Sequence, residues 1–123
     1  VFQEAIDEKQ INLKLDFSDI THLYMDPALA ESMLDNLLKN AIVHNEQQGD
    51  LHIQLADKTL RITNSGQPLT FDPADVFKRF IRSKENKASL GIGLSVVKSI
   101  CDLYGFEITY QFQEKHIFVI KFI

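Results

Sequence analysis

Two long helical patterns, each followed by segments that alternate apolar and polar residues, constrain the fold of this chain most. The first helix is predicted over residues 26 to about 45, because Asp26 is a good N-cap and Pro27 suits the first helical position. Its apolar residues recur at helical spacing and predict one buried stripe, formed by Leu29, Met33, Leu37 and Ala41. The second helix is predicted over residues 91–104, and Gly105 suits a left-handed C-terminal stop.

Five further segments alternate apolar and polar residues, as half-buried strands do. They are residues 11–17, 51–55, 60–63, 106–112 and 117–123. The second and third flank a short turn, and the last two flank residues 113–116, so each pair is predicted to form a hairpin. With a short helix predicted at residues 73–81, the pattern indicates a sheet covered on one face by two or three helices, which is an α+β fold.

Length and composition fit one globular domain over residues 1–123. The chain is 45% hydrophobic and 24% charged, and its net charge of -4 argues against a nucleic-acid partner. No apolar run approaches the roughly 20 residues that cross a bilayer, and no signal-peptide pattern is present, so this segment is not expected to be membrane-embedded.

Cys101 lies in an apolar helical pattern and is interpreted as a core residue. Residues 1–6 look like the tail of a helix that belongs to a segment upstream.

Two asparagines one helical turn apart, Asn36 and Asn40, interrupt the apolar pattern of the first helix. Residues at i and i+4 share a helix face, and asparagine is only a moderate helix former. Their carbonyl oxygens are therefore candidate ligands for magnesium, which prefers oxygen and is usually bound by one or two protein groups together with substrate phosphates. The alternative is that both are ordinary surface residues of an amphipathic helix.

Glycine-bearing turns occur at residues 64–66, after a predicted strand, and at residues 90–94, before a predicted helix. Glycine lets the backbone approach a ligand closely, and the free N–H groups at a helix start favour phosphate. Between the turns, residues 67–90 hold five basic and three acidic side chains in an otherwise acidic chain. Such a stretch is suited to clamping a polyphosphate, and the alternative is a solvated loop with scattered charges.

Taken in chain order, these elements resemble the nucleotide-binding domain shared by gyrase, the large ATP-driven heat-shock chaperones, sensor histidine kinases and MutL. Residues 26–45 resemble the N box, residues 62–69 the first glycine box, residues 76–80 the phenylalanine box and residues 89–94 the second glycine box. The resemblance implies a two-layer α/β sandwich of the Bergerat type. Its mixed sheet would carry helices on one face and a long ATP lid over residues 67–90.

Position 36 distinguishes the branches of this family. Members that hydrolyse ATP place a glutamate four residues before the metal-binding asparagine, where it activates water. Asn36 has no useful basicity, so the resemblance favours a sensor kinase, which transfers the γ-phosphoryl group of Mg-ATP to a histidine in signal transduction by a two-component system. Residues 95–98 also resemble sensor kinases. The alternatives are an ATPase or anti-sigma-type kinase of the same fold, and a degenerate docking module, which Val43, Asn64 and Ser89 keep open.

The resemblance also implies roles for individual side chains. Asn40 would ligate magnesium, and Asn36 would assist at the metal or the phosphates. His44 would lie near the phosphates. Asn64 stands where the family usually has aspartate, and its amide oxygen would accept a hydrogen bond from the adenine amino group.

Two cations of the predicted lid, Arg79 and Arg82, are the candidates for contact with the γ-phosphate. Phe77 and Phe80 are interpreted as anchors that pack the lid helix down. The remaining residues predicted to bind nucleotide are Gly66, Leu69, Phe80, Leu90, Gly91, Ile92, Gly93 and Leu94.

No histidine of this chain lies in the sequence setting that the phosphoacceptor of sensor kinases shows. His22, His52 and His116 lie in or beside predicted strands and are interpreted as solvent-facing. The acceptor is therefore expected on the upstream dimerisation helices of the same kinase, from which the phosphate would pass to the receiver domain of a response regulator. The resemblance further implies a cytoplasmic domain of a membrane-bound sensor kinase.

Overall fold

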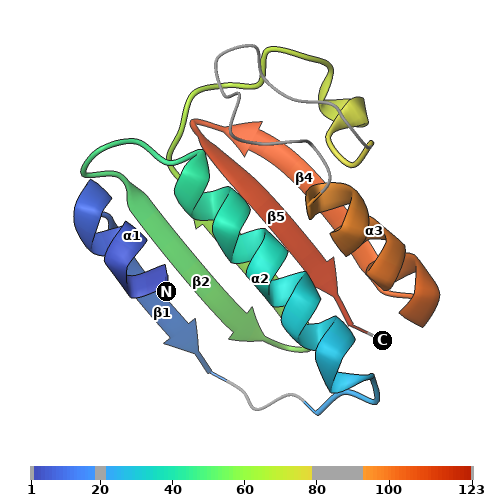
Figure 1. Cartoon of the computed structure of the whole chain (residues 1–123). Coiled ribbons are helices and arrows are strands. Elements are labelled where there is room, and N and C mark those ends of the chain that lie inside the picture. The colour runs from blue at the N-terminus through green and yellow to red at the C-terminus, as the bar shows by residue number, and fades with distance from the viewer. Residues whose placement is uncertain (1, 19–21, 79–92, 123) are drawn as a thin grey trace.

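The computed structural model describes residues 2–18, 22–78 and 93–122 (Figure 1). The helices are α1 (Phe2–Lys9), α2 (Pro27–Val43) and α3 (Gly93–Tyr104), and η1 (Pro73–Asp75) is a 3-10 turn. The strands are β1 (Asn12–Phe17), β2 (Asp50–Ala56), β3 (Thr59–Asn64), β4 (Glu107–Gln113) and β5 (Lys115–Lys121).

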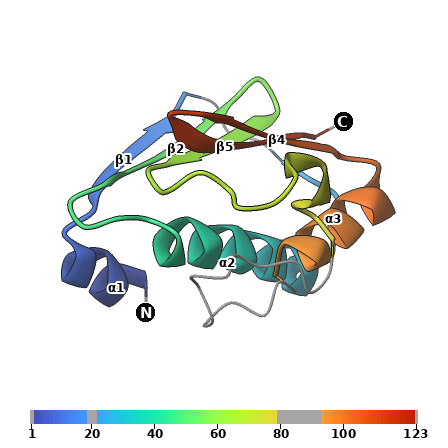
Figure 2. The same cartoon turned by 90° about the horizontal axis from the view of Figure 1, so that it is seen from above.

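The described strands form one sheet in the order β1-β2-β3-β5-β4. Strand β1 runs parallel to β2, whereas the pairs β2-β3, β3-β5 and β4-β5 are antiparallel. A parallel pair needs a crossover connection, and α2 lies within the one that joins β1 to β2. Figure 2 shows α1, α2 and α3 on one face of the sheet. The predicted α+β fold of two layers, with a mixed sheet, is confirmed.

Helix α2 begins as its sequence predicts. Asp26 is the N-cap, and its Oδ1 accepts a hydrogen bond from the Ala28 N–H at 2.8 Å. The Asp26 N–H in turn donates to the Tyr104 hydroxyl at 2.9 Å, which joins the start of α2 to the end of α3. The helix ends at Val43, two residues before the predicted end, with His44 as its C-cap.

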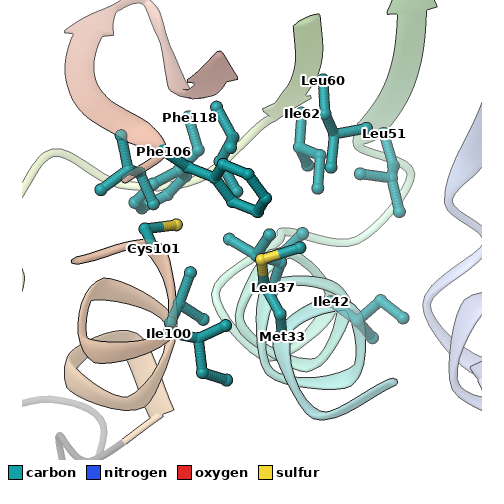
Figure 3. Packing of buried hydrophobic residues seen from close by; sticks show 14 of the residues in the cluster. Met33, Leu37, Ile42, Leu51, Leu60, Ile62, Ile100, Cys101, Phe106 and Phe118 are labelled. Atoms are coloured by element: carbon teal, nitrogen blue, oxygen red, sulfur yellow. The ribbon is translucent and has the colours of Figure 1, made fainter. Parts of the chain in front are cut away.

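The core lies between the helices and the sheet. Met33 and Leu37 of α2 and Cys101 of α3 are almost fully buried and point toward the strands (Figure 3). Burial raises the pKa of the Cys101 thiol to about 11, so this side chain is an apolar core residue, as predicted, and not a nucleophile. Three members of the predicted α2 stripe are buried, and Leu29 packs partly buried at its edge.

The connection after α3 and the turn before β3 also have the structure that the sequence predicts. Gly105 adopts a left-handed φ of 72°, and the Phe106 N–H donates to the Cys101 carbonyl at 2.8 Å, which ends α3 as predicted. Asp57 and Lys58 have φ values of 51° and 56°, so they form the tight turn of the predicted β2-β3 hairpin. No helix in the described part of the chain has the length and apolar character that crossing a bilayer requires.

One prediction for the N-terminal segment is wrong, and it concerns the burial of strand β1. Helix α1 packs within this fold through Ile6, which lies in the core cluster, and its relation to any upstream segment stays a prediction. Strand β1 is not half-buried: its apolar residues Leu13, Leu15 and Phe17 are 40%, 54% and 59% exposed. The physical reason is position, since β1 is the edge strand of the described sheet and has a neighbouring strand, β2, on one side only.

The short helix predicted at residues 73–81 also differs from the structure. In its described part it is the 3-10 turn Pro73–Asp75, capped by Asp72, and i to i+3 hydrogen bonds continue to Lys78. This tight winding lets Val76 become buried while Phe77 packs edge-on against Phe118, with ring centroids 6.1 Å apart. Phe77 is thus an anchor, as predicted, and residues 79–81 lie outside the described residues.

The last hairpin is tighter than predicted. Glu114 alone has a left-handed φ of 62°, and residues 115 and 116 belong to β5 instead of the connection. His116 therefore pairs with Phe112 in the strand register and is only 6% exposed, so the interpretation of His116 as solvent-facing is wrong. His22 is exposed, and His52 is partly buried with Nε2 3.8 Å from an Asp16 carboxylate oxygen.

Candidate functional site

The end of β3 carries a buried acceptor. Asn64 is fully buried, and its Nδ2 donates to the Ser65 carbonyl at 2.9 Å. Since a carbonyl only accepts, this contact fixes the amide orientation and leaves Oδ1 with no hydrogen-bond partner among the described residues. Leaving a buried acceptor unsatisfied costs about 1–3 kcal/mol, which a donor on a ligand would offset.

The turn after β3 approaches the end of α2 so closely that only glycine fits. A β-carbon on Gly66 would lie 2.4 Å from the His44 carbonyl oxygen and 3.1 Å from Cδ2 of His116. The Asp50 N–H donates to Ser65 Oγ at 2.9 Å, and the Ser65 N–H donates to the Asp50 carbonyl at 3.0 Å. The predicted residues Asn64, Gly66 and His44 are thus brought together at one end of the sheet.

Sequence reasoning missed the two side chains that hold the end of α2. Lys9 Nζ donates to the carbonyl oxygens of Ile42, Val43 and Asn45 at 2.9, 3.0 and 3.1 Å. The Ile42 carbonyl also accepts from the Asn45 N–H at 3.2 Å, and the ammonium group adds contacts to the carbonyls at this helix end, so it acts as a cap. The Asn45 side chain donates to the Asp50 carbonyl at 3.0 Å and accepts from the Glu46 N–H at 2.9 Å. A lysine three residues after the buried Ile6 gives no sequence signal for such a contact.

The asparagine pair lies on α2, and the structure brings Asn36 to the start of α3. Asn36 Nδ2 donates to the Ser32 carbonyl at 2.8 Å, so the acceptor Oδ1 is the other end of the amide. A β-carbon on Gly93 would lie 2.9 Å from that Oδ1, which explains a glycine at this position. Asn40, half-buried, follows one turn later on α2. Both amide oxygens therefore lie on the helix that ends beside Gly66.

These residues fit magnesium only together with a nucleotide. Among the described residues, no group of three or more His, Cys, Asp or Glu side chains could hold a metal ion. Asn36 and Asn40 would supply one or two neutral oxygens, which matches an ion that takes its other ligands from water and phosphates.

The two histidines beside this site are held neutral near pH 7. The pKa of His44 is lowered from 6.5, first by burial and then by the charges of His116 and Lys9. The pKa of His116 is also lowered by burial, although its hydrogen bond to the Gln67 backbone works in the opposite direction. A phosphate placed beside them would thus meet uncharged imidazoles.

A groove of about 410 Å³ lies between α1 and α2 and is a separate feature. Its lining is mostly apolar and consists of Phe2, Ala5, Asp35, Asn36, Lys39, Ile42 and Val43. Asn36 lines the groove and is also a predicted nucleotide-binding residue, but the groove does not include Asn40, Asn64 or Gly66. The groove therefore does not coincide with the nucleotide site that the sequence predicts.

The remaining predicted residues divide into two groups. Leu69 and Leu94 are partly buried and pack against the core. Six others lie outside the described residues, and they are Arg79, Phe80, Arg82, Leu90, Gly91 and Ile92.

Comparison with known proteins identifies the family. Residues 25–122 match the family described as histidine kinase-, DNA gyrase B-, and HSP90-like ATPase. The sensor histidine kinase HprS of Escherichia coli (strain K12) is 32% identical over 117 residues, and the alginate biosynthesis sensor protein KinB of Pseudomonas aeruginosa is 29% identical over 111 residues. These alignments cover 89% and 85% of this chain but 25% and 19% of those proteins, so the chain spans a quarter of their length or less.

Solved structures agree with the fold. The mycobacterial sensor histidine kinase MprB has a TM-score of 0.78 with this chain at 19% sequence identity, covering 97% of this chain and 90% of that one. At this level of identity the likeness supports the arrangement of helices and strands alone.

Proposed function

The chain belongs to the family of histidine kinase-, DNA gyrase B- and HSP90-like ATPases, and from this premise we propose that it transfers the γ-phosphoryl group of Mg-ATP to a histidine. It is an ATP-binding catalytic domain of the sensor histidine kinase type. We place the nucleotide at the ends of β3 and α2, beside the start of α3. We assign residues 1–123 to one domain, because a single core cluster extends from Ile6 to Phe122.

One observation carries the position of the base: the buried Oδ1 of Asn64 lacks a hydrogen-bond partner among the described residues. The amino group of adenine is a donor that would satisfy it. Guanine presents a carbonyl at the same place, so two acceptors would face each other. Gly66, which leaves no room for a side chain, keeps the backbone of the following turn close to the bound base.

The phosphates would extend from the base toward α2 and α3. Asn40 would bind magnesium through its amide oxygen, with Asn36 assisting at the metal or the phosphates. The ion supplies neutralisation of charge on the phosphates. The Nδ2 contact of Asn36 with Ser32 supports this role, because it leaves the oxygen end of the amide at the start of α3. Arg79 and Arg82 remain the proposed contacts of the γ-phosphate.

The absence of a carboxylate at position 36 supports transfer over hydrolysis. An amide cannot remove a proton from water, so the site would hold the γ-phosphoryl group without activating a water molecule. Catalysis would then consist of positioning and charge neutralisation, with the nucleophile supplied from outside the site. We propose that this nucleophile is a histidine on upstream dimerisation helices, and that a response-regulator receiver domain takes the phosphate next.

The buried histidines beside the site do not suit the acceptor role. His116 is only 6% exposed and both of its ring nitrogens are hydrogen-bonded, while His44 is partly buried at the end of α2. The proposed setting is the cytoplasm, as one domain of a membrane-bound sensor, with no nucleic-acid partner. The net charge of -4 supports the proposed lack of a nucleic-acid partner.

Calorimetry with ATP and GTP tests the position of the base. The chain should bind ATP more tightly than GTP, by about tenfold or more, which corresponds to roughly 1.4 kcal/mol. Asn64→Ala should lose this preference, whereas Ser65→Ala, which changes the neighbouring hydroxyl, should retain it. Equal affinity of the unmodified chain for the two nucleotides would remove Asn64 from the base site, and no binding of either would support a docking module.

A further inference from the structure

His116 uses both ring nitrogens for specific contacts. Nε2 lies 2.8 Å from the Gln67 carbonyl oxygen, and Nδ1 lies 2.7 Å from the Tyr110 hydroxyl. A carbonyl can only accept, so Nε2 must carry the hydrogen, and the unprotonated Nδ1 then accepts from the tyrosine. Burial raises the pKa of Tyr110 to about 12, so this hydroxyl keeps its proton and serves as the donor. The two partners fix a neutral ring in a single tautomer.

The ring is next to the proposed base site. His116 pairs directly with Asn64 across β3 and β5, so both side chains project from the same face of the sheet. Its Cδ2 and Nε2 lie 3.1 and 3.2 Å from the point where a β-carbon on Gly66 would stand. The imidazole therefore covers Gly66 and bonds to the next residue of the same turn.

This contact joins a strand residue to the Gln67 backbone, 49 residues away in the sequence. Gln67 is exposed and begins the stretch of residues 67–72, which leads to η1 without regular structure. An exposed backbone segment without regular structure has few bonds to hold it in place. The hydrogen bond from a buried strand residue thus ties the first residue of this stretch to the sheet.

We propose that His116 is a positioning residue for nucleotide binding: it holds the turn at Gly66 and Gln67 in place beside the Asn64 acceptor, and Tyr110 sets the tautomer that makes this possible. The inference rests on the proposed location of the base. The ring of His116 also packs against Phe112, with a centroid distance of 5.0 Å. An apolar side chain could make that packing contact equally well, so the proposal assigns the polar role to the two hydrogen bonds of the imidazole.

Three substitutions test the proposal through ATP affinity. His116→Leu removes both hydrogen bonds and should weaken ATP binding by about tenfold, the loss expected for one or two hydrogen bonds that order a binding turn. His116→Gln can donate from its amide to the Gln67 carbonyl and should restore affinity to within about threefold of the unmodified chain. Phe112→Leu, which alters the packing around the ring without touching a hydrogen bond, is the matched control and should bind ATP normally.

Nitrogen NMR of the imidazole gives a readout that packing alone would not change. The spectrum should show protonated Nε2 and unprotonated Nδ1 without nucleotide, and Tyr110→Phe should shift the Nδ1 signal and admit the second tautomer. The proposal is overturned if His116→Leu binds ATP as tightly as the unmodified chain. It is equally overturned if the glutamine and leucine variants lose the same affinity, or if the tautomer is Nδ1–H.

The same measurements separate this inference from the proposed function. If Asn64→Ala keeps full ATP preference, the base site is wrong, yet the tautomer and the amide signals of Gly66 and Gln67 in the His116 variants still report whether the histidine holds the turn. If Asn64→Ala behaves as expected and His116→Leu does not, the base site stands and the positioning role fails.

Discussion

Lys9 of α1 donates from Nζ to the Ile42 carbonyl oxygen at 2.9 Å, which joins two elements 33 residues apart at the last turn of α2. Two more carbonyls of the same turn accept from this ammonium group. The end of α2 lies against Gly66 through the His44 carbonyl, so the lysine holds one wall of the proposed nucleotide site. Stability and nucleotide binding are therefore coupled at this residue.

Replacing this lysine should destabilise the fold. Lys9→Met keeps most of the aliphatic stem but removes the charged donor, and hydrogen bonds that involve a charged group contribute about 1.5–3 kcal/mol each at most. Because the group is partly exposed, we expect a net loss of about 1–3 kcal/mol in the free energy of unfolding, measured by urea denaturation. Lys14→Met on the exposed edge strand β1 is the control and should change stability by less than about 0.5 kcal/mol. Equal effects of the two substitutions would contradict a capping role for Lys9.

Gly66 should tolerate no side chain. A β-carbon there would stand 2.4 Å from the His44 carbonyl oxygen, which is backbone and cannot move aside cheaply. Gly66→Ala should therefore lower both thermal stability and ATP affinity. Gly105→Ala is the comparison: its φ of 72° makes alanine unfavourable by about 1 kcal/mol, but the residue lies at the far end of α3. It should lower stability while leaving ATP affinity unchanged, and an ATP affinity unaffected in Gly66→Ala would place the nucleotide elsewhere.

The order of helices and strands could be predicted because local chemistry determines it. Asp26 and Pro27 mark a helix start, Gly105 marks a helix stop, and the apolar spacing of α2 defines its buried stripe. The same reasoning fails for β1, whose alternation does not tell whether a helix covers it. Burial at a sheet edge depends on strand order, which residues 12–17 do not contain.

The proposed site shows the same division. Site roles for Asn36, Asn64 and Gly66 could be proposed from the sequence, because each residue belongs to a contiguous motif with a chemical reason for its type. Lys9 and His116 could not, because their partners lie 33 and 49 residues away and become neighbours only when α1 meets α2 and β5 meets β3. The misplaced turn at residues 113–116 added to the error: Glu114 in a left-handed conformation makes the connection so short that His116 enters the sheet.

Stability should fall as pH is lowered through the range in which histidine titrates. Burial lowers the pKa of His44 and of His116 in the folded chain below the reference of 6.5. The unfolded state then binds protons more readily, so this contribution to stability is complete above about pH 6.5 and is lost as pH falls below it toward the lowered values. Urea denaturation at pH 7.5, 6.5 and 5.5 measures the effect.

A variant and a second titration range serve as controls for this pH dependence. His116→Gln should flatten the profile between pH 6.5 and 5.5, since one of the two groups no longer titrates. The pKa of Asp50 is lowered by its hydrogen bond and ion pair with Lys115, and its contribution is lost only as pH falls below about 3.8, in a separate range. A flat profile of the unmodified chain from pH 7.5 to 5.5 would mean that neither histidine is buried in solution.

The amide oxygen of Asn40 should matter most when metal is present. Asn40→Ala removes the proposed magnesium ligand from a half-buried position on α2, so ATP affinity should fall by about tenfold or more with magnesium and change little in its absence. Calorimetry with and without the metal makes the comparison, and circular dichroism should show an intact fold. Asn12→Ala, on the exposed strand β1, provides an asparagine that should have no effect. An Asn40→Ala variant that binds Mg-ATP normally would exclude this residue from the metal site.

The isolated chain should bind ATP, hydrolyse it very slowly and not label itself. The proposed site holds the γ-phosphoryl group, but Asn36 cannot activate water and both ring nitrogens of the buried His116 are already hydrogen-bonded, so the attacking atom is missing. Supplying a positioned nucleophile can lower a barrier by roughly 7–11 kcal/mol, so adding the proposed upstream dimerisation helices should produce labelling of those helices. Incubation with γ-labelled ATP measures both outcomes. Rapid phosphate release by the chain alone would favour an ATPase, and stable labelling of His22, His44, His52 or His116 would show that the acceptor lies within this domain.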